Sequence, residues 1–179
     1  MTVRVRTVHT ADLAPGELPA LRELLEEAFE GDFDDEDWDH TLGGMHVLVS
    51  DDRGLAAHGS VILRRVGHRD RWLRVGYVES VGVRPDVQRQ GLGGRVMAGL
   101  ERIVDRAYDL GALSASDEGA GLYAARGWQL WSGRVCALGP DGVLRLPDEE
   151  DCTFLRPAAA GPLDPAYELV FDWRNGDLL

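Results

Sequence analysis

Residues 83–96, VRPDVQRQGLGGRV, place three glycines and three arginines where β-forming residues give way to helix-forming residues. Gly91, Gly93 and Gly94 allow the backbone to turn tightly and to approach a ligand with no Cβ in the way. Because the first N–H groups of the helix that follows have no partner within it, the turn suits a phosphate or pyrophosphate. The arginines that add positive charge are Arg84, Arg89 and Arg95. On these features alone, a ligand-binding turn and a purely structural turn are both open.

A second feature is the acidic stretch at residues 26–39, which holds nine carboxylates. Such a run most often forms a solvated face, and the alternative is a wall that binds a cation. Calcium is not expected, since the stretch lacks the glycine and the glutamate that an EF-hand loop needs at its sixth and twelfth positions. The whole chain has a net charge of −12. This charge argues against nucleic acid as a partner and admits a cationic small molecule.

A third feature is Glu79, in the run YVESVGV just before the glycine-rich turn. Alternating valines around it predict a strand, so Glu79 is either a general base beside the turn or a solvent-facing strand carboxylate. The cysteines Cys136 and Cys152 and the five histidines have no metal-ligand spacing. We therefore expect reduced thiols, hydrogen-bonded histidines and no metal site.

The elements that must position these groups follow from the hydrophobic period. A period of two, bounded by turn residues, predicts strands at residues 3–10, 45–50, 55–66 and 71–85, and later at 112–116, 128–138 and 166–174. A helical period predicts helices at residues 18–29, 92–110 and 119–127, the second of them closed by Gly111. This order favours an α+β fold, with a mixed sheet flanked by helices and with the runs at 45–50, 55–66 and 71–85 forming an antiparallel meander.

Length and composition set the organisation. The 179 residues predict a single domain covering residues 1–179. No apolar stretch is long enough to cross a membrane, and the alternating N-terminus, MTVRVRTVHT, lacks the continuous apolar core of a signal peptide. We expect a cytoplasmic protein with no membrane partner.

Two short motifs resemble markers of the GCN5-related N-acetyltransferases (GNAT). Residues 88–93, QRQGLG, match Gln/Arg-x-x-Gly-x-Gly/Ala, the acetyl-CoA pyrophosphate loop of that superfamily. Residues 122–128, LYAARGW, match a marker with a tyrosine four residues before Gly-aromatic. More specifically, the chain resembles the aminoglycoside 2′-N-acetyltransferases. The blocks that carry this likeness are VHTADL, AFEGDFDDEDWDHTLGGMH, GYVESVGVRPD, GALSAS, LYAARGW and DWRNGDLL.

The resemblance implies a GNAT fold with a mostly antiparallel sheet, and acetyl-CoA as co-substrate. The catalytic residues implied are Glu79, as general base acting through ordered water, and Tyr123, as general acid toward the CoA thiolate. The backbone of Val81 and Val83 would meet the pantetheine arm, with the Val81 N–H as an oxyanion donor. The loop residues implied to hold the cofactor are Gln88, Arg89, Gln90, Gly91, Leu92, Gly93 and Gly94. Neither cysteine matches a nucleophile position, so we expect direct transfer.

The same resemblance implies a polycationic acceptor and a homodimer. The residues expected to bind an aminoglycoside are Asp32, Asp37, Glu79, Ser114, Glu149, Asp177 and Leu179. Two positions depart from the family pattern, since Glu149 replaces an aspartate and Leu179 stands where an aromatic residue is expected. Two alternatives stay open. In the first, the acceptor is another cationic amine, such as a cell-wall amino sugar or a polyamine. In the second, the protein is non-catalytic and either sequesters cationic drugs or senses acetyl-CoA.

Overall fold

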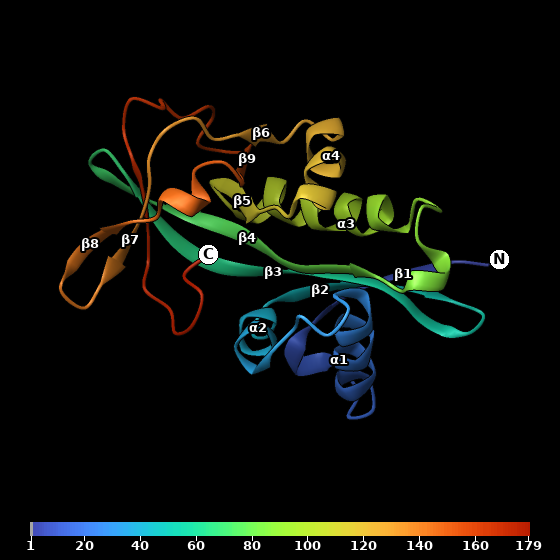
Figure 1. Ribbon diagram of the computed structural model, residues 1–179. Helices are drawn as coiled ribbons and strands as arrows, with labels where there is room; N and C mark the ends of the chain where they lie inside the picture. The colour runs from blue at the N-terminus through green and yellow to red at the C-terminus, as the bar shows by residue number, and fades with distance from the viewer. Residues whose placement is uncertain (1) are drawn as a thin grey trace. The chain divides into compact units, whose positions relative to one another are not determined.

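The computed structural model describes residues 2–179 and contains both helices and strands (Figure 1). The helices are α1 (Glu17–Ala28), α2 (Asp35–Thr41), α3 (Leu92–Ala107) and α4 (Asp117–Ala125). The strands are β1 (Arg4–His9), β2 (Met45–Asp51), β3 (Gly54–His68), β4 (Arg71–Val83), β5 (Leu110–Ser114), β6 (Gln129–Leu130), β7 (Val135–Gly139), β8 (Gly142–Arg145), β9 (Thr153–Pro157) and β10 (Leu169–Phe171). No helix in the part of the chain that is described is long and apolar enough to span a membrane.

The described residues form two compact units. Unit 1 comprises residues 2–62 and Val78–Ile103, and unit 2 comprises Leu63–Tyr77 and Val104–Leu179. Each unit is therefore built from two separate stretches of chain, and β3, β4 and α3 contribute residues to both. The single domain expected from the chain length stays a prediction.

In unit 1, helices cover both faces of an antiparallel sheet (Figure 1). β1 pairs with β2, and β2 pairs with β3, both in the antiparallel sense. On one face, α1 buries Leu21, Leu24 and Leu25, which recur at helical spacing. On the other face, α3 lies so close that a Cβ added at Gly59 of β3 would come within 2.7 Å of the Val96 side chain. The small residue at this position of β3 therefore allows α3 to pack closely against the strand, whose two faces are both covered by helices.

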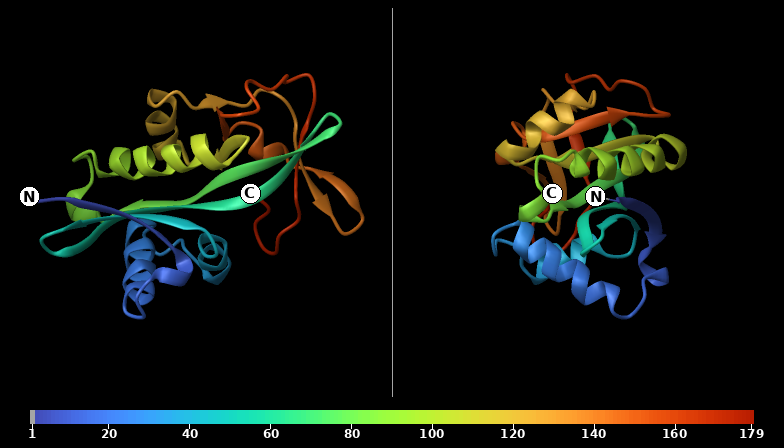
Figure 2. Two further views of the ribbon diagram at one scale, coloured as in Figure 1. Left: turned by 180° about the vertical axis from the view of Figure 1, so that it is seen from behind. Right: turned by 90° about the vertical axis from the view of Figure 1, so that its right-hand side faces the viewer.

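In unit 2, the strand order is β6-β9-β5-β4-β3-β10-β7-β8. β5 runs parallel to β4 and β7 runs parallel to β10, whereas β5–β9, β6–β9, β3–β10 and β7–β8 are antiparallel. Figure 2 shows β7 and β8 as a hairpin in orange. The sheet is thus mixed and mostly antiparallel, as the sequence predicted.

A buried arginine organises the core of unit 2. Arg64 donates from Nε to Asp172 Oδ1 at 2.9 Å and from Nη1 to the Leu178 carbonyl at 2.7 Å. Its guanidinium lies over the rings of Tyr77 and Phe171, with Cζ 5.2 and 5.4 Å from their centroids. Because a buried cation needs several partners, this one position ties β3, β10 and the segment after β10 together.

The structure differs from the sequence expectations at four points. Helix α3 ends at Ala107, not at residue 110, because the Asp109 N–H donates to the Arg74 carbonyl at 2.9 Å and starts β5 at Leu110. Gly111 therefore lies in β5 and closes no helix. The strand expected at residues 128–138 is divided into β6 and β7. Helix α2 and strands β8 and β9 were not predicted.

The Gly43-Gly44 pair before β2 allows an open position to be compared with a close approach of the backbone. Gly43 has a φ of 87°, with nothing near a built Cβ, whereas a Cβ on Gly44 would lie 2.1 Å from the Val61 carbonyl oxygen. We expect Gly44→Ala to lower the free energy of unfolding by about 3 kcal/mol, because the obstructing atom is backbone and cannot rotate away.

Gly43→Ala is the matched control for this prediction. It adds the same methyl group in open space, so its cost is backbone strain alone, about 1 kcal/mol. Urea unfolding of both variants measures the difference. Equal losses of stability would show that the close approach to Val61 is relieved by a backbone shift.

Candidate acetyl-transfer site

The glycine-rich turn joins β4 to α3 in unit 1. After a 3₁₀ turn at Pro85–Val87, the chain passes through Arg89 at φ 57° and Gly91 at φ 80° and enters the 16-residue helix α3 at Leu92. A built Cβ at Gly91 meets nothing within 4 Å, so the left-handed φ, rather than lack of space, favours glycine there. The Gln88 amide donates to the Val83 carbonyl at 3.3 Å, which links the turn to the end of β4.

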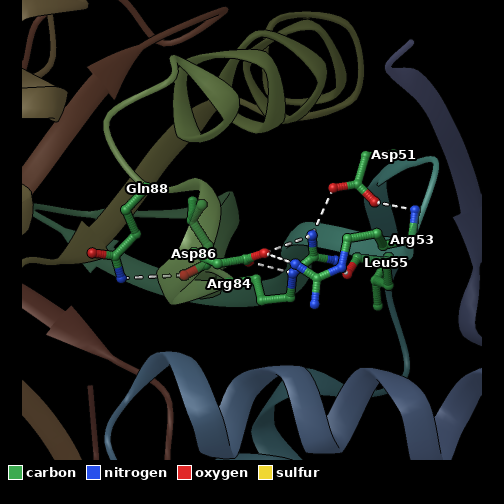
Figure 3. A network of polar contacts seen from close by, with 7 residues as sticks. Asp51, Arg53, Leu55, Arg84, Asp86 and Gln88 are labelled. Atoms are coloured by element: carbon green, nitrogen blue, oxygen red, sulfur yellow. Dashed lines mark hydrogen bonds and ion pairs between the residues drawn. The ribbon is translucent and has the colours of Figure 1, made fainter. Parts of the chain in front are cut away.

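Arg84 fixes the start of this turn (Figure 3). Its Nη2 donates to Asp51 at 2.6 Å, its Nε donates to Asp86 at 2.6 Å, and its Nη1 donates to the Leu55 carbonyl at 2.8 Å. The hydrogen bond from Arg84 is the main reason that the pKa values of both carboxyls are lowered. Arg53 also donates to Asp86. Arg84 is thus committed to carboxylates and positions the turn, whereas the sequence suggested a charge for an anion.

The remaining residues of the turn suit a diphosphate. Gln88, Arg89, Gln90 and Gly91 are exposed, and so is Arg95 in the first turn of α3. The first N–H groups of a long helix point toward such a ligand, and guanidinium groups complement its charge. The residues present therefore fit the pyrophosphate of acetyl-CoA.

Glu79 lies on β4, half-buried, beside a local irregularity of the strand. The next residue, Ser80, has a φ of 50°, which places a non-glycine residue in the left-handed region inside a strand. Such strain persists only where the surroundings hold it, and it is common at functional sites. Val81 and Val83, the predicted partners of the pantetheine arm, are half-buried on the same strand.

The acidic stretch forms a short capped helix. The Asp34 side chain accepts from the N–H groups of Glu36 and Asp37, and the Asp37 carboxylate accepts from the Asp34 N–H at 3.0 Å, a complete capping box. Asp37 is therefore half-buried and partly structural, whereas Asp32 is exposed just before the helix.

Thr41 at the end of α2 connects this helix to β4. Its Oγ1 lies 2.8 Å from the Asp37 carbonyl and 2.5 Å from the Ser80 hydroxyl. Because Thr41 has a single hydroxyl proton and the carbonyl can only accept, Thr41 donates to Asp37 and Ser80 donates to Thr41. Within unit 1 the structure thus places the helix of Asp37 against the residue next to Glu79.

In unit 2, the predicted substrate residues Ser114 and Glu149 lie together. The Ser114 hydroxyl donates to Glu149, and the Cys152 sulfur lies 3.3 Å from each side chain. Burial is the largest cause that raises the pKa of Cys152, and the hydrogen bond between Cys152 and Ser114 is the next largest cause and lowers it. A thiol with a raised pKa is a poor nucleophile, which agrees with direct transfer.

Tyr123 lies in α4 of unit 2 and is buried. Its ring packs against Trp128 and Phe154, with centroids 6.3 and 6.2 Å away. Burial raises the pKa of Tyr123 to about 12, so the phenol keeps its proton at neutral pH. This suits a proton or hydrogen-bond donor, and it equally suits a packing residue.

The C-terminal residues have two different environments. Asp177 is exposed and its carbonyl accepts from Arg174 Nε at 2.7 Å, whereas the Leu179 side chain is buried in the core of unit 2. A cavity of about 740 Å³ in the same unit is lined by Glu150, Asp151 and Glu168 among others. None of the predicted site residues lines it. Among residues 2–179, no group of three or more His, Cys, Asp or Glu is placed to hold a metal ion.

Sequence reasoning missed the residues that hold β4 in shape, namely Thr10, Thr41, His46, His58 and Ser80. Two of them fall in the block that ends Thr-Leu-Gly-Gly-Met-His, residues 41–46. That block carried the resemblance, yet nothing in its composition or spacing indicates which strand it contacts.

The sequence is similar to a known protein family and to a known enzyme. Residues 9–131 match the family described as acetyltransferase (GNAT) domain. An aminoglycoside 2′-N-acetyltransferase from Mycolicibacterium fortuitum is 46% identical over 176 residues, which cover 97% of this chain and 90% of that protein.

Solved structures show the same fold at low sequence identity. A GNAT family N-acetyltransferase (YhbS) from Escherichia coli, in complex with CoA, superposes with a TM-score of 0.67 at 16% identity, covering 96% of this chain and 89% of that chain. The ribosomal-protein-S18-alanine N-acetyltransferase from Escherichia coli gives 0.59 at 16% identity, with 90% and 97% covered. The predicted α+β GNAT fold is thereby confirmed. With a family match over most of its length and a relative 46% identical across nearly all of it, the chain belongs to the GNAT acetyltransferases.

Proposed function

We propose that this protein transfers the acetyl group of acetyl-CoA to the 2′-amine of aminoglycosides. The observation that carries the proposal is the 46% identity to the Mycolicibacterium fortuitum aminoglycoside 2′-N-acetyltransferase across 97% of the chain. Identity at that level across nearly the whole chain supports the same acceptor class. It also disfavours a non-catalytic protein, since Glu79, Tyr123 and the whole cofactor turn are present.

Acetyl-CoA supplies an activated acetyl thioester when bound. The residues that would hold its pyrophosphate are Gln88, Arg89, Gln90, Gly91, Leu92, Gly93 and Gly94, at the start of α3. This assignment rests on the exposed turn, on the helix N-terminus and on the likeness to a fold whose Escherichia coli member is seen with CoA. The backbone of Val81 and Val83 would align the pantetheine arm along β4.

Glu79 and Tyr123 would move the protons. The acceptor amine must lose a proton to become nucleophilic, and Glu79 would take it through an ordered water molecule. The Val81 N–H would stabilise negative charge developing on the carbonyl oxygen of the acetyl group. Tyr123 would donate a hydrogen bond or proton to the departing sulfur, and its raised pKa ensures that the donor is protonated.

Carboxylates would hold the polycationic acceptor. In unit 1, Asp32 and Asp37 would bind ammonium groups of the acceptor. In unit 2, the pair Ser114 and Glu149 would do the same, and so would Asp177. Leu179 would contribute through its main chain, because its side chain is buried. We also propose that the enzyme is cytoplasmic and forms a homodimer. Light scattering of the purified protein would test whether it is a dimer.

The proposed reaction predicts a sharp difference between two drugs. We expect the enzyme to release CoA thiol from acetyl-CoA with an aminoglycoside that carries a 2′-amine and not with one that carries a 2′-hydroxyl. Only the first offers the nucleophile at the reacting position. A thiol-reactive dye measures turnover, and NMR of the product locates the new amide.

The controls separate the acceptor from the reaction. Binding of acetyl-CoA, followed by calorimetry, shows that the enzyme is competent whichever drug is present. If the enzyme turned over a polyamine or a cell-wall amino sugar but neither of the two aminoglycosides, the aminoglycoside assignment would be overturned. Drug binding without thiol release would favour a non-catalytic protein.

A further inference from the structure

A chain of hydrogen bonds crosses the interior of unit 1 and ends on β4. The Thr10 hydroxyl lies 2.7 Å from His46 Nε2, His46 Nδ1 lies 2.9 Å from His58 Nε2, and His58 Nδ1 lies 3.0 Å from the Ser80 carbonyl oxygen. Both imidazoles are completely buried. Two adjacent buried histidines are costly unless each nitrogen has a partner, and here each one has.

The direction of every proton in this chain is fixed by its last member. The Ser80 carbonyl can only accept, so His58 carries its proton on Nδ1 and leaves Nε2 as an acceptor. His46 must then donate from Nδ1, and its own Nε2 accepts the single Thr10 hydroxyl proton at 2.7 Å. The Gly44 carbonyl, 3.2 Å from the same hydroxyl, is the more distant acceptor and already accepts from the Thr10 N–H. All hydrogen bonds in this series therefore point the same way, from the Thr10 hydroxyl toward the Ser80 carbonyl. This arrangement requires both imidazole rings to be neutral.

The carbonyl at the end of the chain belongs to the peptide that joins Ser80 to Val81. That peptide is trans, since the described residues contain no cis bond, so its C=O and its N–H point in opposite directions. A hydrogen bond that fixes the Ser80 carbonyl toward His58 consequently fixes the Val81 N–H away from it. The hydrogen bond to the Ser80 carbonyl therefore sets the direction of the Val81 N–H.

We propose that His58, held by His46 and Thr10, is a positioning residue that aims and polarises the Val81 N–H as the oxyanion donor of acetyl transfer. The inference rests on the proposed function for its catalytic consequence. It explains why Ser80 adopts a left-handed φ of 50° in the middle of a strand. The Ser80 carbonyl accepts from the His58 side chain at 3.0 Å, a partner that lies outside the backbone ladder of a regular strand.

Ser80 is clamped on its side chain as well. Its hydroxyl donates to Thr41, which itself donates to the Asp37 carbonyl of α2. Main chain and side chain of one residue are thus tied to two different elements, β3 and α2. Both ties come from buried residues, which leaves the Ser80–Val81 peptide little freedom to rotate.

Burial supports the neutral state that this chain requires. Desolvation is the largest cause that lowers the pKa of His58 to about 3 and the pKa of His46 to about 4. A nearby histidine lowers each value further, namely His46 beside His58 and His9 near His46. Both rings therefore stay neutral where the enzyme would work.

The first test needs no substrate. Long-range ¹H–¹⁵N NMR of the free protein reports which ring nitrogen carries the proton. We expect both His46 and His58 to be neutral with the proton on Nδ1, whereas isolated neutral histidine favours the other tautomer. A proton on Nε2 of His58 would overturn the proposal, whatever the protein acetylates.

The second test compares two replacements at one position. An asparagine amide occupies roughly the place of Nδ1, so His58→Asn keeps a donor for the Ser80 carbonyl, whereas His58→Leu removes it. Both variants lose the bond to His46. We expect His58→Leu to lower kcat by up to about 100-fold at unchanged KM for acetyl-CoA, and His58→Asn to retain most of the native kcat. The Val81 amide resonance should move in the leucine variant and stay in place in the asparagine variant.

Several outcomes decide against the proposal. Equal kcat values for the two variants, with equal losses of thermal stability, would make His58 a purely structural residue. An unmoved Val81 resonance in His58→Leu would do the same, and it is readable even if activity is lost or the acceptor proves different. If the native enzyme turned over no aminoglycoside while the tautomers and the Val81 shifts followed expectation, the proposed acceptor would fail and the positioning role of His58 would stand.

Discussion

Replacing Glu79 by glutamine is expected to lower kcat with a 2′-amino aminoglycoside by about 10²- to 10⁴-fold, the usual contribution of a general base. Glutamine has the shape and hydrogen-bonding reach of glutamate and cannot accept the proton. Because Glu79 is half-buried on β4 and lies outside the turn proposed to hold the cofactor, KM for acetyl-CoA should be unchanged. Steady-state thiol release at saturating acetyl-CoA measures both parameters.

A matched control lies in the same unit. Glu23 is exposed on α1, and Glu23→Gln makes the same chemical change without touching β4. It should have native kcat. If Glu79→Gln also kept native kcat, the carboxylate would only bind the acceptor or face solvent, and water or another group would remove the proton.

The parts of the molecule that sequence predicts well are those that depend on neighbouring residues. The turn at residues 88–94 needs glycine for its φ values and the start of a helix for its free N–H groups. The glycines and the helix-forming residues are neighbours in the sequence, so both requirements can be recognised there. The amphipathic helices α1 and α3 are likewise visible from their own spacing. The likeness to a known family then supplied the roles of distant residues that spacing alone does not indicate.

Elements without a local signal were missed. Helix α2, DEDWDHT, has no apolar period and exists because Asp34 and Asp37 cap each other and Trp38 packs against the core that contains Leu21. Strand β9 starts with three buried residues in succession, so it shows no alternation to read. In both cases tertiary contacts decide the structure.

Arg84 shows why charge near a motif is a weak guide to ligands. The sequence places it within a few residues of the glycine-rich turn, which suggested an anion partner. The structure gives it Asp51 and Asp86 instead, and Asp51 comes from a strand end more than thirty residues away. Whether an arginine meets a ligand or a carboxylate depends on the partner that the fold delivers.

The buried histidine pair predicts an unusual loss of stability in acid. Both rings have folded pKa values lowered by burial, to about 4 for His46 and about 3 for His58, against 6.5 in the unfolded chain. Between pH 6.5 and pH 4 the unfolded state therefore binds protons that the folded state does not. The free energy of unfolding falls with decreasing pH by about 1.4 kcal/mol per pH unit for each ring.

His58→Asn isolates one ring's share of this effect. The variant has no imidazole to protonate, so its stability deficit relative to the native protein should be largest at pH 7. Below pH 6 the deficit should shrink by about 1.4 kcal/mol per pH unit. Urea unfolding at several pH values between 7 and 4.5 measures it.

Val47→Ala provides the control for that measurement. Val47 is fully buried on β2 next to His46, and the change removes apolar volume without altering any titrating group. Its deficit should be the same at every pH, because native and variant then lose stability in parallel. A pH-independent deficit for His58→Asn as well would mean that His58 takes up its proton equally in the folded and unfolded states. The ring would then be charged within the fold below pH 6, and the directed chain from Thr10 to Ser80 would break there.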